Sequence, residues 1–143
     1  MSIELAIRDP RIALEPELIA RLVSLVEHGE GRALPVSISI VDDAEIHRVN
    51  KQFLDHDEPT DVIAFDLGDA HGGGVAGEVV VSAECAERVA KELGHGARYE
   101  LAFYVCHGLL HLCGWEDADP ESRDRMHARQ EEYLARLGVE LSR

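Results

Sequence analysis

Basic residues are scarce in this chain. Its 143 residues include 14 lysines and arginines against 28 aspartates and glutamates, a formal charge of −14 with histidine neutral. Because phosphate binding depends on lysine and arginine, this deficit excludes a broad nucleic-acid-coating surface and leaves room only for a local basic cleft. Cysteine is also rare, and the three thiols have no C-x-x-C spacing, which indicates reduced thiols rather than a disulfide framework.

Long apolar runs are missing as well. No run approaches the roughly 18 residues that a membrane-spanning helix needs, so no membrane partner is expected. The first residues, Met1 to Leu5, lack the basic region and the continuous apolar core of a secretory signal. The sequence therefore predicts a cytoplasmic location.

The chain does contain enough apolar surface for one folded unit. Hydrophobic residues make up 45% of it, and a chain of this length buries about two-thirds of the surface that its unfolded form exposes. No linker or internal repeat divides it. Residues 1–143 are therefore expected to form a single domain of the α+β class.

Alternating and helical apolar patterns locate the expected elements. Strands are predicted over residues 3–8, 36–41, 62–65 and 78–82. Helices are predicted from Pro16 toward Gly29, from an Asp42 or Asp43 cap through Phe53, over 83–93, over 98–112 and from Asp119 onward. Residues 68–77 read as a mobile turn without a phosphate-loop pattern. We expect a mixed sheet of about four strands packed by helices, with the helix 98–112 at the centre as one wall of a cleft.

A histidine pair carries the clearest chemical signal. His107 and His111 are four residues apart on the predicted central helix, which places their Cβ atoms about 5–6 Å apart on one face. Gly114 permits a turn through positive φ that can bring Asp117 to the same ion. Two imidazoles and a carboxylate leave a fourth position open for water, which is the layout of a catalytic zinc site. The sequence thus predicts one Zn²⁺ held by His107, His111 and Asp117, although other divalent transition metals accept the same ligands.

The alternative is a pair of hydrogen-bonded structural histidines. The helix around the pair is apolar nearly all round, as in a buried element, and two unpaired imidazoles inside a core are unfavourable. Metal ligation therefore explains the pair better. The spacing is also similar to that of metzincin peptidases, but Gly108 stands where their glutamate base would be, which argues against a peptidase.

Four segments resemble the YbeY family of metal-dependent endoribonucleases. His107 to Asp117 is similar to the family signature H-G-x-L-H-L-x-G-[YW]-[DE]-H, and Asn50 to Phe65 is similar to N-x-x-[YF]-R-x-x-x-x-P-T-D-V-L-S-F. Gly77-Glu78-Val79 stands where the family has G-D-I, and the closing helix matches around Arg125-Met126. The resemblance covers nearly the whole chain.

The resemblance implies a function. YbeY proteins are single-strand-specific endoribonucleases of ribosomal RNA maturation and ribosome quality control, in which a metal-activated water attacks the phosphodiester. Single-stranded or ribosomal RNA, the ribosome and ribosomal proteins are the implied partners, and a metal ion is the implied cofactor. The alternative is a ribosome-associated assembly factor with a structural metal and little nuclease activity.

The chain departs from the family pattern at two positions. The family's third metal histidine is Asp117 here, and its carboxylate adds a negative charge that makes the ion a weaker Lewis acid. The family's arginine, expected to face the substrate phosphate, is Leu54 here, so positive charge must come from elsewhere. The candidates, each of which also reads as an ordinary solvated helix charge, are Arg48, Lys51, Arg88, Lys91 and Arg98.

Three residues near the motifs keep two interpretations each. Asp61 either hydrogen-bonds near the metal cleft or caps the turn before a strand. Glu116 either supports the metal ligands as a nearby acid or is a solvated loop residue. Trp115 either stacks on an RNA base or packs beside the metal loop, and packing is favoured. No catalytic side chain beyond the metal ligands is evident, and the remaining histidines share no ligand spacing.

Overall fold

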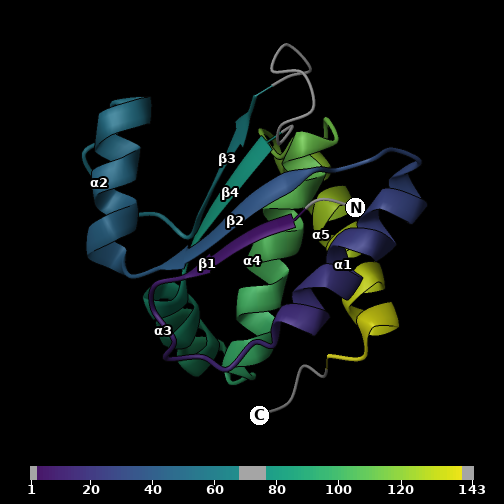
Figure 1. Cartoon of the computed structure of the whole chain (residues 1–143), viewed down its shortest axis with the longest axis horizontal. Helices are drawn as coiled ribbons and strands as arrows, with labels where there is room; N and C mark the ends of the chain where they lie inside the picture. Colours follow the sequence, from purple (N-terminus) through teal and green to yellow (C-terminus); the bar gives the residue numbers. More distant parts are fainter. Residues whose placement is uncertain (1–2, 68–76, 140–143) are drawn as a thin grey trace.

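The computed structural model describes residues 3–67 and 77–139, in which strands and helices appear in the predicted order (Figure 1). The strands are Ile3–Ile7 (β1), Val36–Val41 (β2), Val62–Asp66 (β3) and Gly77–Ser82 (β4). The helices are Pro16–Glu30 (α1), Asp43–Leu54 (α2), Ala83–Leu93 (α3), Ala97–Leu112 (α4) and Pro120–Leu137 (α5). The predicted α+β class is confirmed. The turn predicted over residues 68–77 lies outside the described residues except at Gly77, which begins β4.

The sheet is mixed, as the sequence predicts. Its strand order is β1-β2-β4-β3, with β1, β2 and β4 parallel and β3 antiparallel to β4 at one edge. The two central strands, β2 and β4, are buried along most of their length because helices cover both faces. Their register pairs Ile38 with Val79, two fully buried side chains at the middle of the core.

Side-chain caps determine where three of the helices begin. Asp42 accepts a hydrogen bond from the Glu45 N–H at 2.9 Å, which resolves the choice between Asp42 and Asp43. Asp119 accepts from the Ser122 N–H at 2.8 Å, and the following proline needs no partner at the first helical position. Ser82 caps α3 in the same way. Local hydrogen bonds therefore fix where α3, the helix before α4, and α5, the helix after it, begin.

The helices divide between the two faces of the sheet. Figure 1 shows α2 alone on one face, while α1, α4 and α5 cover the other. Beneath α2, Ile46 and Val49 pack with Val80 and Ile63 in a small cluster of their own. Phe53, which belongs to the same apolar pattern, is 61% exposed and meets only the ring of Phe65 beside this cluster, at 5.9 Å. None of the described helices combines the length and apolarity that crossing a bilayer requires.

Helix α4 packs closely on the sheet because position 108 has no side chain. A Cβ atom at Gly108 would lie 2.5 Å from Val79 Cγ1 and 3.3 Å from Val62 Cγ2. Gly108 therefore faces β4 and β3, about a quarter turn around the helix from His107. A side chain at position 108, such as the glutamate of peptidases, would therefore have to displace Val79.

Replacing Gly108 with alanine is expected to lower the free energy of unfolding by about 2 kcal/mol. Overpacking against the fully buried Val79 costs about 3 kcal/mol and outweighs the gain of about 1 kcal/mol in helix propensity. Urea denaturation measures the loss. In a Val79→Ala background the added methyl group has room, so the loss should fall below about 1 kcal/mol. An equal loss in both backgrounds would show that this contact does not limit the packing.

Candidate metal centre

The partly exposed side chains of α4 follow one line. Between Glu100 and Leu112 only Phe103, His107 and His111 are not buried, and they are spaced one helical turn apart. The other residues of this stretch pack into the core. The two imidazoles therefore share the open face of the central helix, with their Nε2 atoms 3.0 Å apart.

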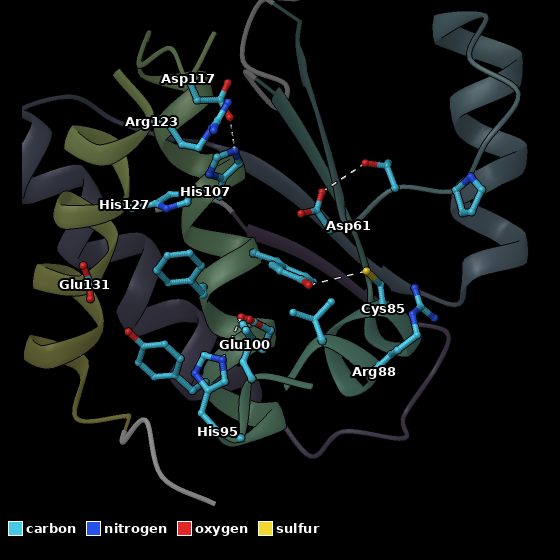
Figure 2. Close-up of a pocket in the computed structure, with 18 residues that line it drawn as sticks. Asp61, Cys85, Arg88, His95, Glu100, His107, Asp117, Arg123, His127 and Glu131 are labelled. Carbon is cyan, nitrogen blue, oxygen red and sulfur yellow. Dashed lines mark hydrogen bonds and ion pairs between the residues drawn. The ribbon is translucent and has the colours of Figure 1, made fainter. Parts of the chain in front are cut away.

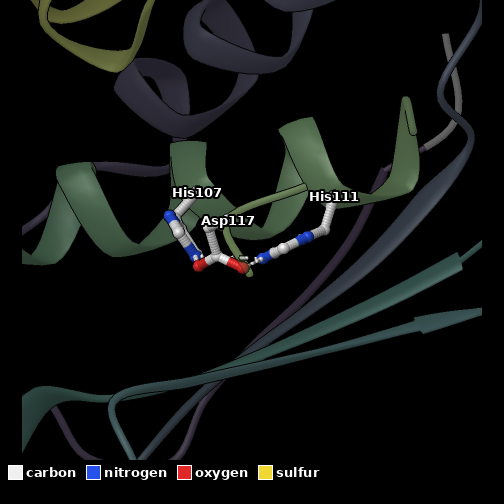
Figure 3. A group of neighbouring side chains, drawn as sticks. All are labelled: His107, His111 and Asp117. Carbon is white, nitrogen blue, oxygen red and sulfur yellow. Dashed lines mark hydrogen bonds and ion pairs between the residues drawn. The ribbon is translucent and has the colours of Figure 1, made fainter. Parts of the chain in front are cut away.

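The loop after α4 brings a carboxylate to this pair. Gly114 has a φ of 97°, the left-handed conformation that favours glycine, and the chain turns back there as predicted. Asp117 then lies with Oδ2 3.1 Å from His107 Nε2 and with Oδ1 3.5 Å from His111 Nε2 (Figure 3). One ligand atom from each of the three side chains lies within 4.8 Å of the other two. The structure thus brings the three predicted ligands together.

Hydrogen bonds at the far side of each ring determine which nitrogen carries the proton. His111 Nδ1 is 3.0 Å from the Trp115 carbonyl, which only accepts, so Nδ1 is the donor. His107 Nδ1 is 3.0 Å from Gln130 Oε1, and the Gln130 amide N–H donates to the Phe103 carbonyl at 3.0 Å. The amide is thereby oriented with its oxygen toward His107. In both neutral rings Nε2 is left without a proton.

This arrangement fits a metal ion. Two nitrogen lone pairs that face each other at 3.0 Å repel unless a positive charge lies between them. Two ligand atoms about 2.0–2.1 Å from one ion at tetrahedral angles are about 3.3 Å apart, close to the observed separation. The Asp117 carboxylate supplies an oxygen donor beside both nitrogens. Outward-facing Nε2 atoms held by Nδ1–H donation to protein oxygens are typical of metal-binding histidines.

Burial also prepares His107 for a metal. It lowers the pKa of the His107 imidazole, because the charged ring would lose hydration, and the nearby His111 acts in the same direction. The ring is therefore neutral at pH 7, which is the form that binds a metal.

A partly buried carboxylate at the end of α1 holds the loop after α4 in place. Glu30 accepts hydrogen bonds from the Trp115 indole N–H at 2.7 Å, the Tyr133 hydroxyl at 2.6 Å and the Arg129 guanidinium at 2.9 Å. Burial alone would raise the pKa of Glu30, but these three donors outweigh it and the pKa is lowered. An ionised Glu30 thus ties Trp115, whose carbonyl orients His111, to α1 and α5.

Known proteins are similar to this chain in sequence and in fold. A family model described as Endoribonuclease YbeY matches residues 12–138. This chain belongs to the YbeY family. Endoribonuclease YbeY of Carboxydothermus hydrogenoformans is 42% identical over 86% of both chains, and that of Bacillus licheniformis is 32% identical over 99% of both. The solution structure of TM1509 from Thermotoga maritima is similar with a TM-score of 0.64 and 27% identity, covering 94% of this chain and 88% of that one. The resemblance seen in the motifs is confirmed.

In this member of the YbeY family, His107 and Asp117 open into a cavity of about 1440 Å³ (Figure 2). His107 and Asp117 line one end of it and His95 lines the other. Helix α4 forms its floor, and residues of α3 and α5 form the two sides. The predicted cleft beside the central helix is present.

The residues with two interpretations take separate places around this cavity. Asp61 lines it, and its Oδ1 accepts the Val62 N–H at 2.8 Å, which is the predicted cap of the turn before β3. Glu116 is exposed and does not line the cavity, which fits the solvated interpretation. Trp115 packs against the main core and is held by Glu30, so the packing interpretation is favoured.

Most of the predicted sources of positive charge are already paired. Leu54 is 44% exposed at the end of α2 and does not line the cavity. Four of the five candidates lie in ion pairs, which are Arg48–Glu45, Lys51–Asp57, Arg88–Asp43 and Arg98–Glu15. Only Arg88 among the five lines the cavity, and its guanidinium is 2.9 Å from the Asp43 carboxylate.

Sequence reasoning overlooked Arg123. It lies near the start of α5 and lines the cavity together with His107 and Asp117 (Figure 2). Within the described part of the chain its guanidinium forms no hydrogen bond or ion pair. The available signal was its place six residues after Asp117, on the first turns of the helix that follows the metal loop.

Gln130 was also overlooked. It is fully buried, between the buried Met126 and Tyr133 of α5. Gln130 could have been found as a single amide within an apolar helix stripe. A buried amide needs partners for its hydrogen-bonding groups, so such a residue indicates a specific contact.

Proposed function

We propose that this chain is a metal-dependent, single-strand-specific endoribonuclease that acts in ribosomal RNA maturation and ribosome quality control. The observation that carries the proposal is the convergence of two unprotonated Nε2 atoms and the Asp117 carboxylate at one end of a large cavity. Membership of the YbeY family supplies the reaction class. His107, His111 and Asp117 are the proposed metal ligands.

We infer that the ion is Zn²⁺. Two imidazoles and one carboxylate are a ligand set that zinc accepts readily, and no thiol belongs to the cluster. When bound, such an ion supplies a Lewis acid for phosphate oxygens and lowers the pKa of a water molecule. The protein's part is to fix the orientation of both rings, His107 through Gln130 and His111 through the Trp115 carbonyl.

The number of ligands favours a catalytic ion over a structural one. Structural zinc sites have four protein ligands and are closed, whereas three ligands leave a position for water or substrate. Among the described residues only three side chains gather here. The side chains of His111 and Asp117 remain 32% and 35% exposed beside the cavity. This openness is a reason to prefer a nuclease to an assembly factor with a structural metal.

Arg123 is the proposed phosphate-binding residue. The carboxylates that line the cavity repel a phosphodiester, and Arg88, the other arginine there, is neutralised by Asp43. An unpaired guanidinium beside Asp117 can donate two parallel hydrogen bonds to phosphate oxygens. Arg123 would then supply at the metal end of the cavity the charge that Leu54 lacks.

Replacing Arg123 with glutamine is expected to reduce kcat/KM for single-stranded RNA by about tenfold or more, the equivalent of one charged hydrogen bond. The slope of log K against log salt should fall by about 0.7, because one phosphate contact is lost. Arg125→Gln is the matched control, since Arg125 lies on the same helix, is paired with Glu121 at 2.8 Å and does not line the cavity. Equal effects of the two variants would show that the loss comes from the change in net charge and not from a specific contact between Arg123 and a phosphate.

The proposal includes the ribosome and ribosomal proteins as partners and a cytoplasmic location, where that substrate is found. A chain with a charge of −14 can contact few phosphates by itself. Protein contacts on the ribosome would help to place the RNA in the cavity.

Metal removal tests the proposed function. After dialysis against a chelator the protein should lose at least about 100-fold of its cleavage rate on a single-stranded RNA, and stoichiometric Zn²⁺ should restore it. A duplex of the same sequence should be cut far more slowly. Undiminished cleavage by metal-free protein would rule out the proposed mechanism, and absence of cleavage in all states would favour the assembly factor.

A further inference from the structure

The cavity extends well beyond the metal ligands. Its floor runs along α4 from His107 through Phe103 to Tyr99, which is about 12 Å of helix. Its volume of about 1440 Å³ exceeds the roughly 300–1,000 Å³ of ordinary ligand pockets. The end away from the metal is therefore large enough for a part of the substrate other than the scissile phosphate.

Aromatic rings follow one another along this floor. The rings of Tyr99 and Phe103 are stacked at 5.9 Å with 22° between their planes. His127 meets Phe103 edge-on at 5.4 Å, and His95 lies 5.7 Å from Tyr99. Tyr99 and Phe103 remain partly exposed in the cavity. Successive aromatic faces in a groove are the usual platform for the bases of single-stranded nucleic acid.

A buried carboxyl group lies beside these rings. Glu100 is only 5% exposed, yet it lines the cavity, and its Oε2 has no hydrogen-bond partner among the described residues. Figure 2 shows it next to His95, whose Nε2 is 3.8 Å from Glu100 Oε1 and likewise has no partner there. A buried carboxyl oxygen without a donor is costly, so this position is suited to accept a hydrogen bond from a bound molecule.

Charge decides which part of an RNA strand enters. Asp61, Glu100 and Glu131 line the cavity and repel phosphates, whereas Arg123 lies at the metal end. A strand whose phosphate is held near Arg123 can therefore direct a base, but not its backbone, toward Tyr99 and Glu100.

We propose that the end of the cavity formed by Tyr99, Phe103, His95 and Glu100 is a nucleobase subsite that selects bases with an exocyclic amino group. The base stacks on the aromatic rings, and its amino N–H donates to the Glu100 carboxyl. This inference rests on the proposed function, because it assigns a preference to the same RNA-cleaving site.

The selectivity follows from the donors and acceptors of each base. Adenine, cytosine and guanine present an amino donor on the pairing edge, whereas uracil presents two carbonyl acceptors around its single N–H. Burial raises the pKa of Glu100, and the nearby Asp61 acts in the same direction while His95 opposes both. The ionised carboxylate only accepts hydrogen bonds, so it pairs with an amino group and is repelled by the two carbonyl oxygens of uracil. A protonated carboxyl could donate to a uracil carbonyl, so the preference belongs to the ionised form.

The test uses the Zn²⁺-loaded protein and short oligouridines in which one adenosine is moved through every position. Adenosine at one position relative to the cut should raise kcat/KM about tenfold over the all-uridine strand, and cytidine there should do the same. Glu100→Gln keeps the shape but can donate to a carbonyl, so the preference should fall to within about twofold. Tyr99 is more exposed than Glu100. Tyr99→Leu should reduce cleavage of the adenosine strand more than cleavage of the all-uridine strand.

Controls separate the subsite from general effects. Glu92→Gln and Phe53→Leu remove an exposed carboxylate and an exposed aromatic ring outside the cavity, and both should retain the preference. Equal cleavage of all strands by the parent protein would overturn the subsite while leaving the nuclease intact. A preference that survives in Glu100→Gln would also overturn it and would leave Glu100 as a structural partner of His95.

A binding measurement keeps the two proposals distinguishable. Calorimetric titration of the metal-free protein with adenosine and uridine 5′-monophosphates reports on the subsite without cleavage. Tighter binding of the adenosine nucleotide, lost in Glu100→Gln, would support the subsite even if no RNA were cut. Equal binding of both nucleotides would contradict it.

Discussion

A His111→Ala protein is expected to bind Zn²⁺ at least about 100-fold more weakly than the parent and to lose cleavage of single-stranded RNA. Loss of a residue that merely orients a metal ligand costs about 10–100-fold in affinity, so loss of a ligand costs at least as much. With His111 gone, only His107 Nε2 and the Asp117 carboxylate remain, 3.1 Å apart. Competition with a chromogenic chelator measures the affinity, and gel analysis of a labelled RNA measures the cleavage.

His28→Ala is the matched control for this variant. His28 is exposed in the last turn of α1 and lies outside the metal cluster and the cavity. Its replacement should change neither zinc affinity nor cleavage. Parent-like zinc binding by His111→Ala would contradict the assigned ligand set.

The two replacements of Asp117 are expected to act in opposite directions. Asp117→Ala removes the oxygen donor and should weaken Zn²⁺ binding by at least about tenfold, with a comparable loss of cleavage. Asp117→His gives the three-histidine pattern of the family and should retain the metal. A neutral imidazole offsets less of the ion's positive charge than a carboxylate does, which leaves a stronger Lewis acid. Cleavage by Asp117→His should therefore be at least as fast as by the parent.

Calorimetry with Zn²⁺ and the same RNA assay measure both variants. If Asp117→Ala keeps parent affinity and activity, Asp117 is not a ligand and its approach to the imidazoles is only an ion pair. If Asp117→His loses the metal, the loop after Gly114 is fitted to a carboxylate and does not accept the longer ring.

The metal ligands could be predicted because their geometry is local. His111 follows His107 by four positions on one helix, and the chain reaches Asp117 through a single turn at Gly114, so spacing alone specifies their approach. The course of α4 was readable for a related reason. An apolar helix with two histidines can only be a buried element with one open line of side chains, and that line contains Phe103, His107 and His111.

The supporting residues could not be predicted, because they come from distant parts of the chain. Gln130 reaches His107 from α5, and Glu30 reaches Trp115 from the end of α1. Arg123 lies in the cavity only because α5 packs beside α4, which spacing does not reveal. The family pattern drew attention to Leu54, but that position does not line the cavity. These contacts depend on how the helices pack against one another. Sequence periodicity describes each helix separately, so it does not predict them.

Anomalous diffraction from crystals of the zinc-loaded protein, recorded on both sides of the zinc absorption edge, tests the central claim most directly. The account predicts one peak about 2.0–2.2 Å from His107 Nε2, His111 Nε2 and an Asp117 oxygen, with no fourth protein ligand and an open side toward the cavity. A peak elsewhere, a fourth protein ligand, or an Asp117 turned away from the ion would contradict it.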